Sequence, residues 1–306
     1  CTLAVLLSFW VTALWFEIYF IKLVGAFAIL AAGGVFAILA AMRFKATPVF
    51  AIEGDILTEN QAPSLWARIQ SMAGKLGTSP PDRIIAGVDP SIFVTAHPVT
   101  LANTTQTGRT LYLSLPLLKT MSIDEADAVL GHEMAHFSGE DTTWSMRVAP
   151  LVARLETYMR ELSQNPLTLS VFHFLHGFWK IYQISLRRHG RNREFRADSI
   201  GANMATPRAV SHALAKVSAY CQYRDEVEAD MMKRGKLEGD IGLPAKLESG
   251  FPGSLAAFVN NKSSITSELP HPFDTDPPPA QRVKHLGLCT EDVLSEPALM
   301  QPAGRT

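Results

Sequence analysis

The sequence predicts a mainly helical protein with a few short strands, an α+β fold that follows an N-terminal pair of membrane-spanning helices. Three observations lead to this prediction. The first 42 residues carry only two charges, several later stretches space their apolar residues as helices do, and three short runs between residues 84 and 115 resemble strands. We therefore expect a two-helix transmembrane anchor over residues 1–45 and a folded domain over residues 46–306.

The anchor is predicted from two apolar runs. Residues 23–42 are twenty residues without a charge, about the length that crosses a hydrocarbon core as a helix. Residues 1–16 are also uncharged, so Glu17 and Lys22 would lie at the turn of a helical hairpin. A secretory signal peptide is the alternative. Two long runs with no small-residue cleavage site after them favour the anchor.

Composition limits the compartment and the partners. Arg43 and Lys45 follow the second apolar run, so the positive-inside rule predicts that the rest of the chain faces the cytoplasm. The chain has 28 Lys+Arg and 29 Asp+Glu, a net charge of -1, which argues against a nucleic-acid partner. Its three cysteines are far apart and give no disulfide framework. We expect a lipid bilayer as a partner and no nucleic acid.

The folded domain is predicted to begin with a helix and three strands. Residues 63–76 have helical spacing of apolar side chains, and Gly77 follows as a stop signal. Residues 84–88, 92–95 and 110–115 read as short strands, the last two joined by a polar, turn-rich stretch.

Helices follow in the second half of the chain. Ser122 and Glu125 form a Ser-x-x-Glu capping box that opens a helix ending near Phe137. Further helices are predicted at 151–162, 193–205, 207–236 and 280–286, and a loop at 239–253. Residues 167–186 carry only three ionisable groups, and we expect an additional helix there, either membrane-associated or buried.

The motif that carries chemistry is His132-Glu133-Met134-Ala135-His136. On a helix, residues four apart project from the same face, so the two imidazoles can bind one Zn²⁺. Glu133 lies beside them as a general base for a water on the metal. Because the rest of this helix is largely apolar, the two histidines and the glutamate need a polar partner. We therefore predict one zinc ion per chain.

A catalytic zinc needs a third protein ligand and an open fourth position. Glu194 and Asp198 lie one helical turn apart on a later helix. Glu194 can act as the third ligand while Asp198 accepts a ring N–H from a ligand histidine and fixes its orientation. Gly201 would let this helix pack closely on its neighbour. An exposed Glu–Arg–Asp helix face is the alternative interpretation.

With this spacing, the chain resembles the gluzincin peptidases that include HtpX and the CAAX prenyl endopeptidases. The resemblance extends from about residue 63 to residue 286. It implies an integral-membrane zinc endopeptidase of a bacterial-type inner membrane, with a zincin-like, mostly helical metallopeptidase domain and a small antiparallel sheet. Proteins or peptides, membrane proteins among them, are the implied substrates. The sequence does not predict the natural substrate or the oligomeric state.

The resemblance also implies roles for residues outside the two metal helices. The edge strand to which substrate adds would be Phe93, Val94, Thr95 and Ala96, although the Asn-Ala-Phe typical of that strand is absent. His271 would reach the active site and stabilise the oxyanion. Arg282 would anchor the C-terminal tail through an ion pair with a carboxylate.

The predicted reaction is zinc-assisted hydrolysis of a peptide bond, with Glu133 as the general base. Two alternatives stay open at this point. One is a CAAX-type prenyl-protein processing peptidase, a role associated with a large chamber of many membrane spans. The other is a membrane scaffold that keeps zinc for structure alone. Retention of both histidines, Glu133 and Glu194 favours an enzyme.

Overall fold

The computed structural model describes residues 50–102, 104–139, 141–164, 168–234, 242–261 and 276–300, with a few isolated residues before them. The chain divides into two compact units, residues 1–48 with 147–182 and residues 49–146 with 183–306. None of the helices formed by the described residues has the length and apolar character needed to cross a membrane. Nearly all of the predicted anchor, 1–45, lies outside the described residues, so the anchor and the division at residue 45 stay predictions.

Two small sheets lie in the second unit. The four-stranded sheet has the order β2-β3-β7-β4, formed by Asp55–Leu57, Arg83–Gly87, Thr110–Ser114 and Phe93–Thr95. The three-stranded sheet has the order β1-β5-β6, formed by Phe50–Ala51, Val99–Leu101 and Thr104–Gln106. The three predicted strands are confirmed as β3, β4 and β7, whereas β6 lies within the stretch predicted as a turn.

The prediction of an antiparallel sheet is wrong in part, because each sheet also contains a parallel pair. β3 and β7 run parallel with Ile84 opposite Leu111, and β1 runs parallel to β5. The remaining pairs are antiparallel. Between β3 and β7 the chain passes through β4, β5 and β6, and this long crossover lets β7 return in the direction of β3. In the strand order β2-β3-β7-β4, β4 lies at an edge of the sheet.

Three helices lie next to strands of the four-stranded sheet along the chain. α3 (Pro63–Lys75) connects β2 to β3, and α4 (Leu115–Leu118) and α5 (Ile123–Ser138) follow β7. α3 and α5 are confirmed close to their predicted bounds. They share one core with β3 and β7, in which Ile69 and Met134 are fully buried against Leu111. One face of α5 is thus buried in this core. His132 and His136 of the same helix are not part of this core.

Two long helices follow, α6 (Asp141–Gln164) and α7 (Leu169–Met204). The helices predicted at 167–186 and 193–205 are therefore one continuous helix. The apolar stretch 167–186 is buried along one side only, since Trp179 is 5% exposed while Phe174 is 78% exposed. Whether this stretch is buried or membrane-associated stays a prediction.

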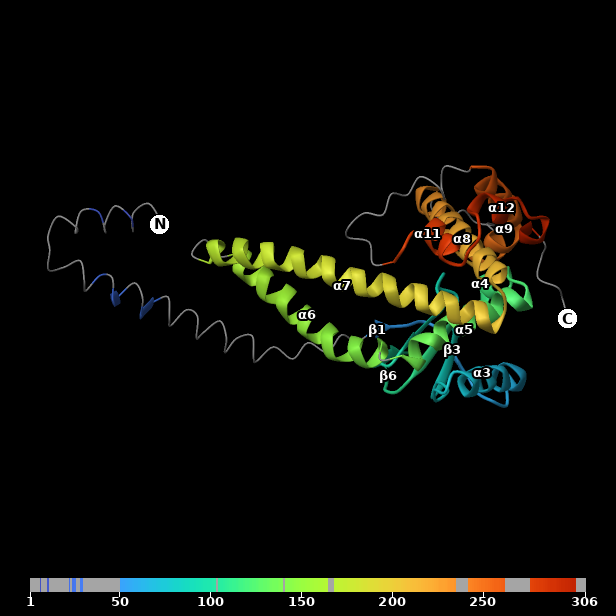
Figure 1. Cartoon of the computed structure of the whole chain (residues 1–306), viewed down its shortest axis with the longest axis horizontal. Helices are drawn as coiled ribbons and strands as arrows, with labels where there is room; N and C mark the ends of the chain where they lie inside the picture. The colour runs from blue at the N-terminus through green and yellow to red at the C-terminus, as the bar shows by residue number, and fades with distance from the viewer. Residues whose placement is uncertain are drawn as a thin grey trace. The chain divides into compact units, whose positions relative to one another are not determined.

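The C-terminal helices, orange to red in Figure 1, pack on α8 (Pro207–Arg234). They are α9 (Leu243–Asn260), α11 (Pro279–His285) and α12 (Thr290–Ser295), followed by the 3-10 turn η1 (Pro297–Met300). The loop predicted at 239–253 is wrong from Leu243 on, where α9 begins; residues 239–241 lie outside the described residues. Leu247, Phe251 and Leu255 recur every four residues and are buried in the α8–α9 core, which holds the helix despite an internal proline.

Candidate metal centre

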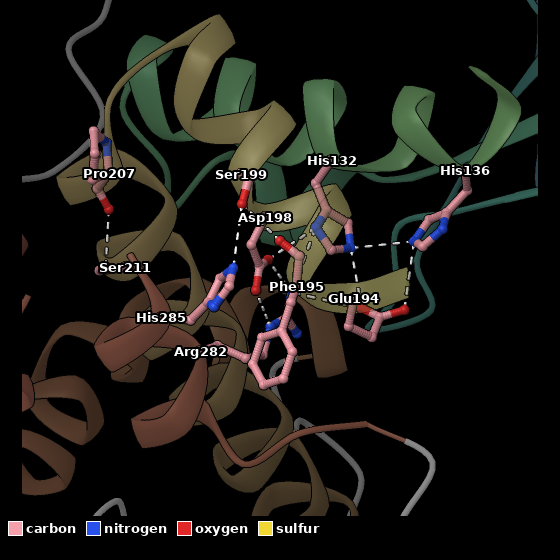
Figure 2. A network of polar contacts seen from close by, with 10 residues as sticks. All are labelled: His132, His136, Glu194, Phe195, Asp198, Ser199, Pro207, Ser211, Arg282 and His285. Atoms are coloured by element: carbon pink, nitrogen blue, oxygen red, sulfur yellow. Dashed lines mark hydrogen bonds and ion pairs between the residues drawn. The ribbon is translucent and has the colours of Figure 1, made fainter. Parts of the chain in front are cut away.

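Helix α5 places His132 and His136 one turn apart on the same face. Its start is fixed by the predicted capping box, in which Ser122 accepts the Glu125 N–H and the Glu125 carboxylate accepts the Ser122 N–H. The Nε2 atoms of the two imidazoles are 3.4 Å apart. Figure 2 shows both side chains extending from α5 toward Glu194.

Helix α7 supplies Glu194 opposite these two rings. Its Oε2 lies 3.3 Å from His132 Nε2, and its Oε1 lies 3.5 Å from His136 Nε2. The three side chains are 12% to 17% exposed, so the cluster is shielded from water but still reachable. Among the described residues, this is the only group of three or more His, Cys, Asp or Glu side chains whose ligand atoms lie close enough together to hold one metal ion.

The donor set fits a zinc ion. Zinc binds imidazole nitrogen and carboxylate oxygen at about 2.0–2.2 Å in tetrahedral geometry, which separates any two donors by about 3.3–3.5 Å. The three measured separations are 3.4, 3.3 and 3.5 Å. Two histidines and one glutamate leave a fourth position without a protein donor, as in catalytic rather than structural zinc sites.

Two glycines allow α7 to come this close to α5. A Cβ atom on Gly201 would lie 2.6 Å from the Ala128 carbonyl oxygen and 3.4 Å from His132 Cβ. A Cβ atom on Gly131 would lie 2.9 Å from the Met204 side chain. The close approach expected at Gly201 from the sequence is therefore present. It brings Glu194 within reach of the two histidines.

Asp198 and Arg282 hold the outer side of the His132 ring. Asp198 Oδ1 lies 3.0 Å from His132 Nδ1, and the Asp198 side chain is fully buried. Arg282 on α11 donates from Nε to Asp198 Oδ2 at 2.7 Å and from Nη2 to Oδ1 at 2.5 Å. Asp198 accepts a hydrogen bond from the Nδ1–H of His132. The other ring nitrogen, Nε2, is therefore the one that could bind a metal ion.

The charges of the cluster shift its pKa values. Burial alone would lower the pKa of His132, but hydrogen bonds with Asp198 and Glu194 outweigh burial and raise that pKa to about 9. Burial opposes ionisation of Asp198 as well, yet its contacts with Arg282 and His132 lower its pKa to about 2. The pKa of Glu194 is also lowered, because the His132 contact outweighs burial. Both carboxylates therefore stay ionised near neutral pH.

Glu133 lies between the donor cluster and the edge of the sheet. Burial raises its pKa, although the nearby His132 and His136 act in the opposite direction. The Val94 backbone hydrogen-bonds the Glu133 carboxylate. Among the described strands β4 pairs with β7 alone, so the Val94 contact places Glu133 next to an edge strand of the sheet. The site thus combines a cluster that could hold a metal ion, a carboxylate with a raised pKa and an edge strand.

The predicted site residues fall into three groups. The structure brings together His132, His136, Glu194, Asp198 and Arg282, with Glu133 beside them. Of the predicted substrate strand, Phe93, Val94 and Thr95 form β4 and Ala96 follows its end. His271 lies outside the described residues, so its role stays a prediction.

Two arginines at the end of α5 were not predicted. Arg196 Nη2 donates to the Ala135 carbonyl oxygen at 3.3 Å, and Arg109 Nη2 donates to the Phe137 carbonyl oxygen at 3.2 Å. Arg109 also lies 4.0 Å above the Phe137 ring centroid. The Phe137 carbonyl is among those that a helix end leaves without an intrahelical partner, whereas the Ala135 carbonyl also accepts the Gly139 N–H and the Ser138 hydroxyl. The position of Arg196 between Glu194 and Asp198 was the only sequence signal for such a role.

Several known proteins are similar to this chain over most of its length. The chain is 24% identical to an HtpX protease homologue from Aeropyrum pernix over 72% of this chain and 73% of that protein. It is 26% identical to an HtpX protease homologue from Methanocaldococcus jannaschii over 76% of each chain. The HtpX protease of Thioalkalivibrio sulfidiphilus is 25% identical over 69% of this chain and 76% of that protein. No solved structure matches the chain significantly.

The family comparison covers the whole site described above. The profile of Peptidase family M48 matches residues 59–288, a range that includes both metal helices, the edge strand β4 and Arg282 on α11. This range is about three quarters of the chain. The resemblance found in the motifs is thereby confirmed: the chain belongs to Peptidase family M48, and is a protease.

Proposed function

We propose that this protease is a membrane-anchored, zinc-dependent endopeptidase that hydrolyses peptide bonds of protein substrates. The observation that carries the proposal is the match between the donor separations of His132, His136 and Glu194 and those of a tetrahedral zinc ion. The uncharged runs within residues 1–45 support the anchor, and Arg43 and Lys45 support a cytoplasmic domain of an inner-membrane protein. Membrane proteins are substrates that such an anchor would place nearby.

In this proposal each side chain has a defined task. His132, His136 and Glu194 would hold the zinc ion, which when bound polarises the peptide carbonyl and makes the attacking water more acidic. Glu133 removes a proton from that water and returns it to the leaving amine. Its raised pKa favours the first transfer, because a more basic carboxylate accepts a proton more readily. Val94 and its neighbours on β4 would pair with the extended substrate, and His271 would stabilise the oxyanion.

The test compares the wild-type chain with Glu133→Gln. We expect the variant to bind one zinc ion per chain and to lose cleavage of casein and of a model membrane protein. A chelator should abolish wild-type cleavage, and added zinc should restore it. Glu156→Gln, at an exposed position on α6, is the matched control and should cleave normally.

The same assay separates the alternative functions. Zinc bound without any cleavage by the wild-type chain would favour a scaffold in which the metal has a structural role. Cleavage restricted to prenylated peptides would favour a CAAX-type processing peptidase. Full activity of Glu133→Gln would remove this residue from the mechanism.

A further inference from the structure

A loop of five residues, 88–92, connects β3 to the edge strand β4. We call it the β3–β4 loop. Helix α8 contacts the backbone of this loop at two places. Arg224 donates from Nη1 to the Val88 carbonyl oxygen, and Cys221 Sγ donates to the Pro90 carbonyl oxygen at 3.6 Å. The loop is thus tied to a helix that lies far along the chain.

The four-stranded sheet contributes a third contact to the β3–β4 loop. The Asp89 N–H donates to the hydroxyl oxygen of Tyr112, at 3.1 Å, and Tyr112 is fully buried on β7. The Tyr112 ring also stacks on Phe93, the first residue of β4, with 5.1 Å between the ring centroids. Three successive residues of the loop are therefore each held by a hydrogen bond, and two of these bonds come from α8.

The two side chains of α8 are well suited to donate. The Arg224 side chain is 11% exposed, and Glu228 orients its guanidinium by accepting a hydrogen bond from Nε at 2.6 Å. Burial raises the pKa of the Cys221 thiol, so the thiol stays protonated at neutral pH and keeps its hydrogen. Because a thiol is the weaker donor, the contact from Arg224 is the main one.

The strand that follows the loop has little support of its own. β4 has three residues, fewer than the 5–6 or so of a usual strand, and pairs along these three positions with β7. No other described strand pairs with it. The position of β4 therefore depends on what holds its ends as well as on the sheet.

The position of β4 affects the general base of the proposed reaction. The Val94 backbone hydrogen-bonds the Glu133 carboxylate, and Glu133 directly follows the candidate metal ligand His132. In the proposed function, on which this inference rests, an extended substrate pairs with β4 while Glu133 acts on the water. A shift of β4 would displace both relative to the metal ion. A misplacement of about 1 Å can lower a rate about 100-fold.

We propose that Arg224 and Cys221 are positioning residues of this reaction, which hold the β3–β4 loop on α8 and thereby keep β4 aligned with Glu133. Both act through the loop backbone, since neither belongs to the cluster of candidate metal ligands or to β4. The burial of the Arg224 side chain and its orientation by Glu228 make the alignment rigid.

Amide hydrogen exchange tests whether α8 holds the loop and the strand. In Arg224→Met, residues 88–96 should exchange at least about tenfold faster than in the wild-type chain, the effect expected from losing a hydrogen bond to a charged group. Exchange in β7 should not change, whereas general destabilisation would accelerate it too. Unchanged exchange in residues 88–96 would overturn the inference.

Arg208→Met is the matched control for the exchange measurement. It removes an arginine from the same helix, but this arginine is exposed and contacts Glu296 instead of the loop. Residues 88–96 should exchange as in the wild-type chain. If the two arginine variants had equal effects on these residues, the contact with Val88 would have no special role and the inference would be overturned.

Kinetics of the zinc-loaded chain test the alignment itself. Arg224→Met should lower kcat for an extended peptide about 10–100-fold, because the strand edge remains but its alignment is lost. KM should change less than about twofold, and one zinc ion should still bind per chain. Arg224→Lys keeps a cationic donor for the Val88 carbonyl and should recover most of kcat. A wild-type kcat in Arg224→Met would overturn the inference and leave the proposed function intact.

The cysteine provides a second, smaller test. Cys221→Ala should lower kcat less than Arg224→Met does, since the thiol is the weaker donor. Cys289→Ala, at an exposed cysteine, is its control and should cleave normally. A wild-type chain that cleaves no peptide would count against the proposed function alone. The exchange of residues 88–96 would then still decide whether α8 fixes β4: faster exchange in Arg224→Met supports this, and equal exchange overturns it.

Discussion

Arg282 binds both carboxylate oxygens of Asp198, at 2.7 Å and 2.5 Å, and so connects α11 to the helix that carries Glu194. Asp198 in turn contacts His132 Nδ1 at 3.0 Å. One buried carboxylate therefore links the C-terminal helix α11 to His132, a candidate metal ligand. A two-pronged contact of this kind fixes orientation as well as charge.

Replacing Arg282 should weaken metal binding. Arg282→Met leaves the buried Asp198 carboxylate without its main counterion, which destabilises a protein by about 3–5 kcal/mol. We expect zinc affinity to fall about 10–100-fold, the effect typical of losing a contact behind a metal ligand. Arg282→Lys keeps the charge but not the two-pronged contact. Its zinc affinity should lie between those of the wild-type chain and Arg282→Met. Competition titration with a chromogenic chelator measures the affinity.

Lys284→Met is the matched control for Arg282, since Lys284 is exposed on the same helix. It should change the free energy of unfolding by no more than about 0.5 kcal/mol. If Arg282→Lys bound zinc as tightly as the wild-type chain does, the two-pronged contact would have no part in orienting His132.

Zinc binding should release a proton at neutral pH. The pKa of His132 is raised to about 9 in the metal-free chain, so below that pH its imidazole is protonated. A metal ion binds only the neutral ring and must displace this proton. The affinity should therefore rise about tenfold per pH unit as the pH increases toward 9, and level off above it. Calorimetry in two buffers of different ionisation enthalpy counts the released protons.

Asp198→Asn should change this pH dependence in a defined direction. The hydrogen bond with the Asp198 carboxylate is the largest of the effects that raise the pKa of His132. Its loss lowers that pKa, so the variant should release fewer protons at pH 8 than the wild-type chain does. An unchanged proton count would show that Asp198 does not control the protonation of His132.

The local geometry of the site could be predicted because it follows from helix periodicity. His132 and His136, and likewise Glu194 and Asp198, are each four residues apart, so any α-helix places each pair on one face. The contact between the two helices was harder to predict, since it depends on tertiary packing at Gly201 and Gly131. Periodicity contains no information about which later helix approaches α5.

The errors in the predicted fold also arise from tertiary packing. Prolines and glycines around residues 242–253 favour a loop locally, but burial of Leu247, Phe251 and Leu255 stabilises α9. The parallel pairing of β3 with β7 depends on the path of the intervening strands, which a strand pattern does not encode. Tertiary contacts outweighed local preference in both places.

Gly201→Ala should separate the two metal helices. The new methyl group would lie 2.6 Å from the Ala128 carbonyl oxygen, a backbone atom that cannot turn aside as a flexible side chain can. We expect a loss of about 1–3 kcal/mol in the free energy of unfolding, as for other overpacked positions, together with weaker zinc binding. Chemical denaturation and metal competition measure the two effects.

Gly177→Ala provides the control for Gly201, because it introduces the same methyl group on the same helix with no atom within 4 Å. Alanine is favoured over glycine inside a helix by about 0.5–1 kcal/mol, so this variant should be slightly more stable. Equal effects of the two substitutions would mean that helix propensity, and not close packing at Gly201, decides the outcome.

A buried ion pair stabilises the start of α5. Lys216 Nζ on α8 lies 2.7 Å from Glu125 Oε2, and the two side chains are 1% and 3% exposed. The same oxygen accepts the Ser122 N–H of the capping box. His212 Nδ1, also on α8, lies 3.7 Å from Glu125 Oε1. Glu125 therefore has one local partner, Ser122, and two partners from a distant helix.

The ion pair with Lys216 predicts different stabilities for a single and a double substitution. Lys216→Met leaves the Glu125 carboxylate buried without its cation and should destabilise the chain by about 3–5 kcal/mol. Adding Glu125→Gln removes the unpaired charge, while glutamine can still form the capping box, so the double variant should be more stable than Lys216→Met alone. Lys119→Met, which breaks the exposed pair with Glu248, should cost no more than about 1 kcal/mol. Urea denaturation of the wild-type chain, Lys216→Met, the double variant and Lys119→Met measures these free energies of unfolding. A double variant less stable than Lys216→Met would refute the role of the unpaired buried charge.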